Sequence, residues 1–294
     1  MLANLRDVLR EADQENKAVP AFNCATLENI RAAIRAAEEM DSSIIIEYAE
    51  AHQNFIPIEE IGPIMIDYAK KASVPVAVHL DHGGSLDFIK TAIEIGFTSV
   101  MIDASGLPIE ENITTTKKVV EYAHSHDVSV EAELGHIFNS SIGAGEGAKI
   151  DSASDYSNLD DIYTNPEESR YFVEQTGVDC LAVAFGTVHG IYLEEPKLDF
   201  DRVKEIDQIV SVPLVMHGGS GVNEDDYYKL INNGIRKINY YTYANKAAAE
   251  AVSAYISENN DDKNLLFDHM STIAINAMTK NYKDIIKVFN NGCM

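Results

Sequence analysis

The stretch Pro213-Leu-Val-Met-His-Gly-Gly-Ser-Gly221 is the part of the chain on which the interpretation of the fold depends. A short apolar run ends on His217, and a glycine-rich turn follows at once. In a parallel α/β protein, this pattern predicts a strand that brings His217 to the carboxyl edge of the sheet, followed by a loop that can hold an anion. Similar runs end at His82 and His189, in Val76-Ala-Val-His-Leu-Asp-His82 and Leu181-Ala-Val-Ala-Phe-Gly-Thr-Val-His189. We expect the three stretches to form one metal site beside one phosphate site.

Around these stretches, short apolar or β-branched runs alternate with longer amphipathic segments along the chain. The expected strands are Val19–Asn23, Ser43–Tyr48, Val74–Asp81, Ser99–Asp103, Ser129–Leu134, Cys180–Phe185, Val212–His217 and Lys237–Tyr241. Helical patterns lie between them at about 27–40, 58–72, 85–95, 109–126, 166–176, 199–209, 223–233 and 243–258. The even spacing, and the lack of Gly-x-Gly-x-x-Gly after the first strand, favour a (β/α)8 TIM barrel over a doubly wound sheet.

Two segments stand outside this alternation. Residues 263–292 form one more amphipathic pattern, which predicts an additional C-terminal helix packed on the barrel or on a partner subunit. We therefore expect residues 1–294 to form a single barrel domain with a C-terminal helical extension. Residues 136–165, after the fifth strand, have weak periodicity, and a long connection at the carboxyl edge of a barrel is typical of a lid over an active site.

The composition excludes several classes of function. Lys and Arg total 23 against 47 Asp and Glu, a formal net charge of -24 that repels nucleic acids and anionic membranes. The same charge opposes a phosphorylated substrate, so a phosphate site would need backbone N–H groups and a metal. The three cysteines lack CxxC spacing, which favours a reducing, cytoplasmic setting. No signal peptide and no run of about 18 apolar residues is present, so we expect no membrane association.

His82, His189 and His217 follow the third, sixth and seventh expected strands. Residues at the carboxyl ends of barrel strands form active sites, whereas residues in mid-strand fill the core. Any one of these histidines could be a hydrogen-bonded structural residue. Together they offer three neutral imidazoles around an open position, the arrangement that a catalytic Zn²⁺ requires. The other histidines are interpreted as structural, and these are His52, His79, His124, His126, His136 and His269.

Carboxylates stand close to these histidines in the sequence. Asp81 precedes His82, and both can reach one site only if the strand breaks there, which Gly83-Gly84 would allow. A carboxylate beside a metal can move a proton. The alternative role for Asp81, capping the next helix, is better served by Ser85 or Asp87.

The fifth expected strand carries Glu131 and Glu133 on one face. Buried carboxylates need partners, so we expect both to form hydrogen bonds near the metal. Glu133, nearer the edge, is the better candidate for an alternate ligand or for a contact to a ligand. Asp103, which ends the fourth strand, could act in the same way or simply cap.

The anion site is expected in the last two loops, where barrels commonly bind phosphate. Its candidate residues are Gly218, Gly219, Ser220, Gly221, Asn239 and Thr242.

These motifs, taken in combination, resemble one known family. The stretches that carry the likeness are Ala21-Phe-Asn23, Val78-His-Leu-Asp-His-Gly83, Phe97-Thr-Ser-Val-Met-Ile-Asp103, Val130-Glu-Ala-Glu-Leu-Gly135, Thr176-Gly-Val-Asp179, Gly186-Thr-Val-His-Gly190, Pro196-Lys-Leu-Asp199, the His217 motif and Gly234-Ile-Arg-Lys-Ile-Asn239. Over nearly its whole length, the chain resembles the class II, zinc-dependent fructose- and tagatose-bisphosphate aldolases.

The resemblance implies a (β/α)8 barrel that cleaves a ketose phosphate to dihydroxyacetone phosphate and an aldehyde. It implies zinc on His82, His189 and His217, as a Lewis acid at the C2 carbonyl, and Asp81 as the acid and base at the C4 hydroxyl. The residues implied to bind substrate, mainly through its phosphate, are Asn23, Gly190, Gly218, Ser220, Asn239 and Thr242. A homo-dimer or homo-tetramer is also expected.

The chain departs from the family pattern where the aldehyde would bind. Tyr241 stands where an Asp is typical, Ala49 where a serine is common, and Leu193 where a lysine often follows His-Gly-x-Tyr. After Glu-Leu-Gly the usual glycine and acidic pairs are missing, and Glu146 is left as the candidate for proton exchange at C3. Two alternatives stay open: another metal-dependent barrel reaction, such as isomerisation or hydrolysis, and a non-catalytic barrel that serves as a partner subunit.

Overall fold

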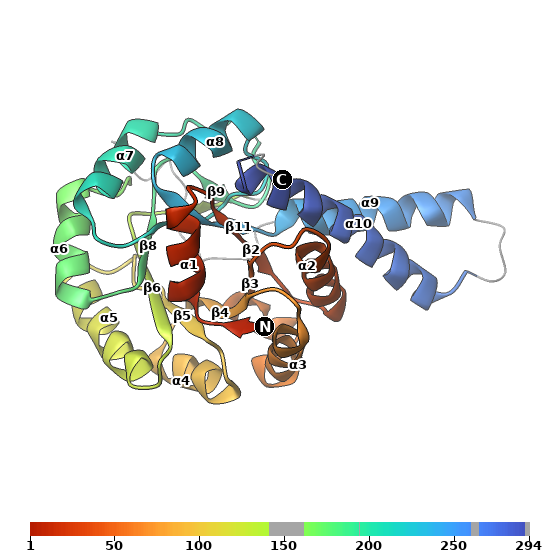
Figure 1. Ribbon diagram of the computed structural model, residues 1–294, viewed down its shortest axis with the longest axis horizontal. Helices are drawn as coiled ribbons and strands as arrows, with labels where there is room; N and C mark the ends of the chain where they lie inside the picture. Colours follow the sequence, from red (N-terminus) through yellow and green to blue (C-terminus); the bar gives the residue numbers. More distant parts are fainter. Residues whose placement is uncertain (141–161, 194, 260–264, 292–294) are drawn as a thin grey trace.

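The computed structural model describes residues 1–140, 162–193, 195–259 and 265–291. Eight parallel strands close into a ring in which each strand pairs with the next along the chain and the last pairs with the first (Figure 1). In chain order they are β2 (Val19–Asn23), β3 (Ile44–Ala49), β4 (Val76–Gly83), β5 (Ser99–Ile102), β6 (Ser129–Leu134), β8 (Cys180–Val183), β10 (Leu214–Met216) and β11 (Ile235–Tyr240). The predicted (β/α)8 barrel is confirmed.

Helices surround the ring on its outer side (Figure 1). They are α2 (Leu27–Glu39), α3 (Ile58–Lys71), α4 (Leu86–Ile95), α5 (Ile109–His124), α6 (Pro166–Thr176), α7 (Phe200–Ile209), α8 (Glu224–Asn232) and α9 (Thr242–Glu258). Local sequence sets several of their ends. The Ser85 hydroxyl caps α4 by accepting from the Phe88 N–H, as expected, and Gly96 ends that helix with a φ of 111°.

The amino end of the barrel is closed by two elements that the sequence interpretation missed. Strand β1 (Leu2–Ala3) pairs with the start of β4 at Val76 and Ala77, and helix α1 (Leu5–Gln14) follows it. The apolar face of α1 packs into the barrel as part of a cluster with side chains from the strands. The members of this cluster are Leu5, Val8, Leu9, Ala12, Val19, Ala21, Ile45, Ala77, Cys180, Ala182 and Val215. This packing removes apolar surface from water at the barrel floor.

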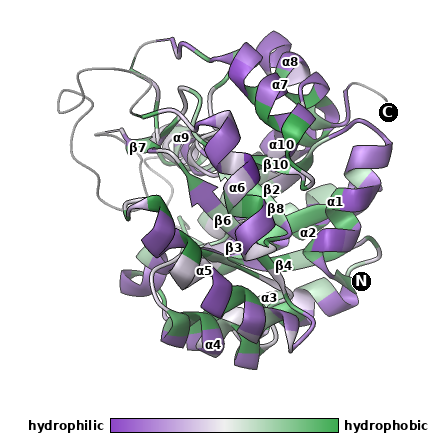
Figure 2. Ribbon diagram, turned by 90° about the vertical axis from the view of Figure 1, so that its left-hand side faces the viewer, coloured by the Kyte–Doolittle hydropathy of each residue, from purple (hydrophilic) through white to green (hydrophobic). Residues whose placement is uncertain are grey.

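The main core lies between the strands and the surrounding helices. All residues of β2, β3, β4, β6 and β11 are buried, and Figure 2 shows hydrophobic residues concentrated on the central strands. Strands buried on both faces are expected in a parallel sheet. Cys24 and Cys180 are buried and free. None of the helices in the described ranges is long and apolar enough to cross a membrane.

Most predicted strands differ from the structure by one or two residues at an end, and two differences have clear local reasons. Strand β4 runs to Gly83 rather than Asp81, because its pairing with β5 resumes at Gly83 and Ile102 after an irregularity. The connection 136–165 is not wholly irregular, because β7 (Phe138–Asn139) pairs with β9 (Val188–His189). The expected lid falls largely on residues 141–161, which lie outside the described residues.

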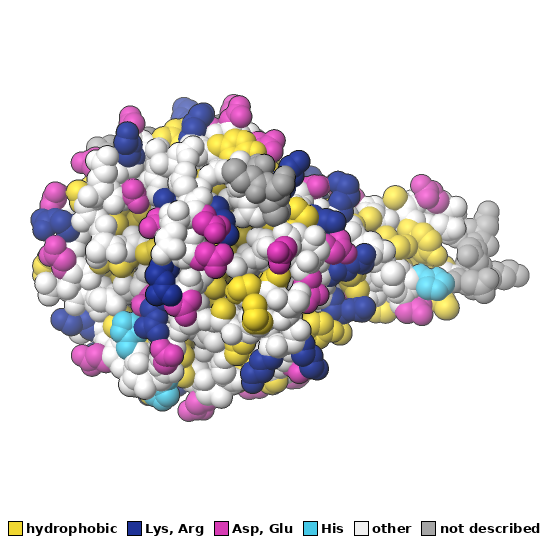
Figure 3. All heavy atoms as spheres, in the orientation of Figure 1, with side chains coloured by type: hydrophobic (Ala, Val, Ile, Leu, Met, Phe, Trp, Pro, Cys, Tyr) yellow, Lys and Arg dark blue, Asp and Glu magenta, His cyan; other side chains and the backbone are white. Residues whose placement is uncertain are grey.

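The predicted C-terminal helix is present as α10 (Phe267–Phe289). It packs against α2 and α9, and the far ends of α9 and α10 project from the barrel as a pair, which we call the arm (Figure 1). Near the barrel, Tyr282, Ile286 and Phe289 of α10 are buried, whereas Phe267 near the arm tip is 78% exposed. Figure 3 shows hydrophobic side chains along the surface of the arm.

Candidate metal centre and active site

Three histidines meet at the carboxyl edge of the barrel. His82 lies near the end of β4, His189 on β9, and His217 directly after β10. Nitrogen atoms of the three imidazoles all lie within 4.8 Å of one another, and each ring is buried. The ring centroids are 5.1 Å apart for His82 and His189, 4.7 Å for His82 and His217, and 5.8 Å for His189 and His217. The spacing suits three ligands around one ion.

The backbone at His82 explains how two neighbouring residues reach one site. His82 has a φ of 47°, a left-handed conformation that is rare outside glycine. The regular strand is therefore interrupted at His82, one residue before the expected Gly83, and pairing with β5 resumes at Gly83. The imidazole Nδ1 lies 2.9 Å from Asp103 Oδ2, which leaves Nε2 for a metal. Burial opposes protonation of His82, but Asp81 and Asp103 outweigh it and raise its pKa to about 9.

His217 is held by the two carboxylates of β6. Its Nε2 lies 2.8 Å from Glu131 Oε1, within hydrogen-bonding geometry. Its Nδ1 lies 3.0 Å from Glu133 Oε2 but is not aligned for a hydrogen bond. Burial opposes protonation here too, yet the two carboxylates raise the pKa of His217 well above its ordinary value. A metal at Nδ1 would occupy this unaligned contact, so Glu133 is placed beside the candidate ion.

His189 is the buried histidine of this group with both ring nitrogens unpartnered in the described part of the chain. Neither of its ring nitrogens has a hydrogen-bond partner among the described residues, although the residue is 1% exposed. Burial, with the charges of His82 and His217, lowers its pKa well below the ordinary value, so the ring is neutral. A buried neutral imidazole without a partner is costly unless it binds something. The chemistry of this donor set therefore fits a metal.

Beneath the histidines lies a buried ion-pair network that the sequence interpretation missed. The Lys237 ammonium of β11 is 2.6 Å from Glu47 Oε1 and 2.9 Å from Glu131 Oε2, and all three side chains are fully buried. Burial raises the pKa of Glu47 to about 8, against the effect of Lys237. His79 adds a contact, with its Nε2 3.7 Å from Glu131. Lys237 thus reaches His217 through Glu131 and helps to fix the ring.

Asp81 faces the same site with both carboxylate oxygens engaged. Asn23 of β2 donates to one oxygen at 3.0 Å, and Asn239 of β11 donates to the other at 3.3 Å. Burial alone would raise the pKa of Asp81, but the charges of His82 and His217 outweigh it and lower the pKa. The carboxylate is therefore ionised at neutral pH and fixed in orientation.

The loops after β10 and β11, in which an anion site is expected, are joined by hydrogen bonds, and we call them the cradle. The Ser220 hydroxyl accepts from the backbone N–H groups of Tyr241 and Thr242, at 3.0 and 3.2 Å, which joins the two loops at the start of α9. Gly218 has a φ of 64°, and a Cβ there would lie 2.3 Å from the Val188 carbonyl oxygen. Only glycine allows this approach without strain.

A tyrosine hydroxyl holds the segment around Gly190 against this cradle. Tyr192 donates to the Gly218 carbonyl at 2.8 Å and accepts from the Val188 N–H at 3.2 Å. Gly190, with a φ of 96°, lies on the same tethered segment. The structure thus brings Gly190, Gly218, Ser220 and Thr242 together.

Of the residues that depart from the family pattern, Ala49 and Tyr241 lie at the carboxyl ends of β3 and β11. Ala49 pairs in register with Asp81, and Tyr241 follows β11. Leu193 is 67% exposed. Glu146 lies outside the described residues, so its predicted role has no structural counterpart here.

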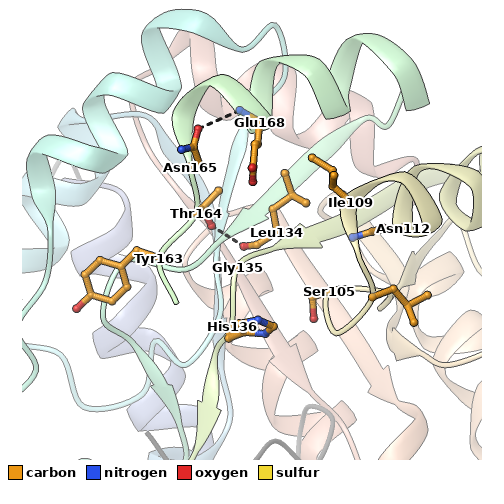
Figure 4. A pocket seen from close by; sticks show the side chains of 11 residues that line it. Ser105, Ile109, Asn112, Leu134, Gly135, His136, Tyr163, Thr164, Asn165 and Glu168 are labelled. Carbon is orange, nitrogen blue, oxygen red and sulfur yellow. Dashed lines mark hydrogen bonds between the residues drawn. The ribbon is translucent and has the colours of Figure 1, made fainter. Parts of the chain in front are cut away.

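A separate pocket of about 310 Å³ adjoins the site on the side of β5 and β6 (Figure 4). It lies between the starts of α5 and α6 and is lined by Ser105, Asn112, Gly135, Asn165 and Glu168, among others. The Ser105 hydroxyl donates to Asp103, the carboxylate that contacts His82. The pocket is therefore linked to the metal centre but is lined by other residues.

A closed parallel barrel with three buried histidines at its carboxyl edge defines a (β/α)8 protein with a candidate metal centre. Residues 3–292 match the family described as fructose-bisphosphate aldolase class-II. The chain belongs to this family and is an aldolase, a lyase of a generally metal-dependent class.

Solved structures agree with this assignment. The YdjI aldolase from Escherichia coli K12 is 35% identical, with a TM-score of 0.83 over 98% of this chain and 97% of that one. A putative fructose-1,6-biphosphate aldolase from Coccidioides immitis is 29% identical, with a TM-score of 0.82 over 97% and 96% of the two chains. The fructose-bisphosphate aldolase of Campylobacter jejuni, 22% identical over 98% and 95% with a TM-score of 0.77, shares the fold.

Proposed function

We propose that this aldolase uses zinc to cleave a ketose phosphate reversibly to dihydroxyacetone phosphate and an aldehyde. The observation that carries the proposal is the meeting of His82, His189 and His217 within 4.8 Å, next to the oriented carboxylate of Asp81. A glycine-rich loop of the type that binds phosphate begins one residue after His217. The metal and phosphate functions would therefore act on one small molecule.

The donor set favours zinc over harder ions. Three imidazole nitrogens around one point suit Zn²⁺, whereas Mg²⁺ and Ca²⁺ prefer oxygen ligands. Asp103 and Glu131 fix the His82 and His217 rings, and Glu133 lies close enough to join as an alternate ligand. When bound, the metal would supply a Lewis acid that stabilises negative charge on the substrate carbonyl oxygen.

Asp81 is proposed to accept the C4 hydroxyl proton during cleavage and to return it during condensation. Asn23 and Asn239 leave its carboxylate with one accessible orientation, and its lowered pKa keeps it ionised. A base in a fixed position removes the need to find a productive rotamer at each turnover. Asn23 and Asn239 also keep side-chain oxygens without partners among the described residues, and these oxygens are available to substrate hydroxyls.

The phosphate is proposed to bind against Gly190, Gly218, Ser220 and Thr242. Backbone N–H groups in the glycine-rich loop can donate to an oxyanion without adding net charge. This mode of binding suits a chain with a formal charge of -24, because it depends on local dipoles rather than on a basic surface.

Two wider predictions stay proposals. Residues 1–294 would form one domain, because α10 packs on α2 and α9 rather than apart from them. A homo-dimer or homo-tetramer is supported by apolar side chains exposed on the arm, where Phe267 is 78% and Leu266 52% exposed.

Metal analysis and substrate screening test the function together. We expect purified protein to hold about one zinc per chain, and a chelator to abolish release of dihydroxyacetone phosphate from a panel of phosphorylated and unphosphorylated ketoses. His189→Ala removes one ligand whose ring nitrogens have no other described partner, so zinc content and activity should fall together. Full activity in metal-free protein, or in His189→Ala, would contradict the proposal.

A further inference from the structure

Beyond the metal and phosphate groups, a buried histidine lies in a short turn at the end of β3. This turn, η1 (Glu50–Asn54), is fixed from several sides. Glu50 accepts from the Gly84 N–H at 2.7 Å, which ties the turn to the segment after His82. Gln53 accepts from the Tyr48 hydroxyl at 2.5 Å and from the Ile58 N–H at 3.0 Å. The backbone carbonyl of His52 also accepts from the Phe55 and Ile56 N–H groups, at 2.8 and 3.1 Å, so the turn is held without any contribution from the His52 side chain.

The imidazole of His52 is fully buried and has no hydrogen-bond partner among the described residues, at either ring nitrogen. Aromatic rings surround it: the centroids of Tyr241, Tyr48 and Phe55 lie at 5.3, 6.0 and 6.2 Å. A buried ring with two unsatisfied polar atoms destabilises a fold unless a bound group satisfies them. By contrast, buried His79 places its Nδ1 2.8 Å from the Ser99 hydroxyl.

His52 borders the active site on the arc of the ring formed by β3, β2 and β11, which carries none of the proposed ligands. The ligands come from β4, β9 and the end of β10, whereas His52 follows β3 and packs on Tyr241, which follows β11. Strand β2 lies between β3 and β11 in the ring, and its last residue, Asn23, donates a hydrogen bond to Asp81. In a ketose phosphate bound with its C4 hydroxyl at Asp81, the carbons beyond C4 would point to this side.

The surroundings of His52 suit an uncharged group. Burial lowers the pKa of His52 to about 4, against the opposite effect of Asp81, so at neutral pH the ring offers one N–H donor and one acceptor. The carboxylate of Asp81 lies close enough to act on His52, and Glu50 belongs to the same turn. These carboxylates would repel a second phosphate. The ammonium inside the barrel, Lys237, is already paired with Glu47 and Glu131.

We propose that His52 binds the aldehyde half of the substrate by a hydrogen bond to one of its hydroxyl groups, and that the site takes hydroxyaldehydes without a second phosphate. The proposal rests on the aldolase function described above and names the chemical class of its second product. Tyr241, whose ring packs on His52, would line the same subsite. Such a residue selects for a hydroxyl because the hydroxyl satisfies a polar atom that is otherwise buried and unpaired.

The test compares three aldehydes in condensation with dihydroxyacetone phosphate: glyceraldehyde, propanal, which lacks its hydroxyls, and glyceraldehyde 3-phosphate. His52→Phe keeps the aromatic packing and removes both polar atoms. We expect it to lower kcat/KM for glyceraldehyde by about 10- to 100-fold and for propanal by less than about 3-fold. His52→Gln, which retains a side-chain donor and acceptor, should recover part of the loss. His126→Phe changes a surface histidine that bonds to the Tyr122 carbonyl, and should match wild type.

Exchange of the C3 proton of dihydroxyacetone phosphate with solvent deuterium needs no aldehyde and separates the possible failures. We expect exchange at the wild-type rate in His52→Phe. The proposal for His52 is overturned if the variant loses glyceraldehyde and propanal activity equally, if it loses exchange, or if wild type prefers glyceraldehyde 3-phosphate. If zinc-loaded wild type shows neither exchange nor condensation, the proposed function itself fails, and this inference fails with it.

Discussion

Replacement of Lys237 by Met should destabilise the protein strongly, although the residue is placed in no contact with substrate or metal. The change removes a buried ammonium that lies 2.6 Å from Glu47 and 2.9 Å from Glu131. Glu131, whose pKa the network holds well below its usual range, would be left as a buried carboxylate without its cation. Removing one partner from a buried ion pair costs about 3–5 kcal/mol, because the remaining charge has no water to compensate it.

The free energy of unfolding would be measured by urea titration of chelated wild type and variant at one fixed protein concentration. Lys280→Met is the matched control, because its ion pair with Asp284 at 2.8 Å is exposed, and we expect no measurable change there. Lys237→Met should also bind zinc about 10- to 100-fold more weakly, since Glu131 orients His217. A variant as stable as wild type, with the same zinc affinity, would refute the argument that Lys237 compensates these carboxylates.

Three further outcomes are expected. Asp81→Asn should lower kcat for aldol cleavage by about 10²–10⁴-fold with zinc content unchanged, and a rate within a few-fold of wild type would remove Asp81 as the base. Gly218→Ala should raise the KM for dihydroxyacetone phosphate by at least about tenfold and lower the melting temperature, because the new Cβ would meet the Val188 carbonyl at a φ of 64°; an unchanged KM would argue against this loop as the phosphate site. Glu47 has its pKa raised from 4.5 to about 8 in the folded protein, so it contributes stability below about pH 4.5 that is lost as the pH rises towards 8. Relative to Glu47→Gln, wild type should therefore become less stable from pH 5 to 8, and a pH-independent difference in unfolding free energy would contradict this assignment.

Much of the fold was predictable because the ring depends on short local patterns. Apolar runs that end in His82 or His217 mark strand ends, and a parallel ring places all such ends on one edge. The predicted strand ends at His217, one residue beyond the observed end of β10 at Met216. The prediction is close because the left-handed turn begins at Gly218. The three histidines could therefore be assigned to one site without knowledge of their distances.

Other features were missed although the sequence carries a signal for them. Leu5, Val8, Leu9 and Ala12 have the spacing of a helical face, but α1 precedes the first of the eight strands and lies outside the alternation of strand and helix. Lys237 alternates with Asn239 along β11 and so shares its inward face. Its partners Glu47 and Glu131 come from distant strands, and only the closed barrel brings them together.

No pattern in the sequence indicates that His52 is buried beside the active site. It lies beyond the regular part of β3, and its burial comes from contacts with Tyr241, nearly two hundred positions further along the chain. A histidine in such a turn looks like a surface residue until the tertiary structure is known. Residues that determine substrate specificity often lie on loops of this kind, where hydrophobic periodicity does not predict which side chains are buried.

Helix α1 seals the barrel floor, so the molecule has one open end and one closed end. The ketose, the aldehyde and dihydroxyacetone phosphate would all enter and leave through the open rim. The closed end is thus a suitable place for chemical attachment, for example at Arg10 of α1, whose side chain is 68% exposed. A tether fixed there would immobilise the enzyme on a solid support with its opening turned towards the solution.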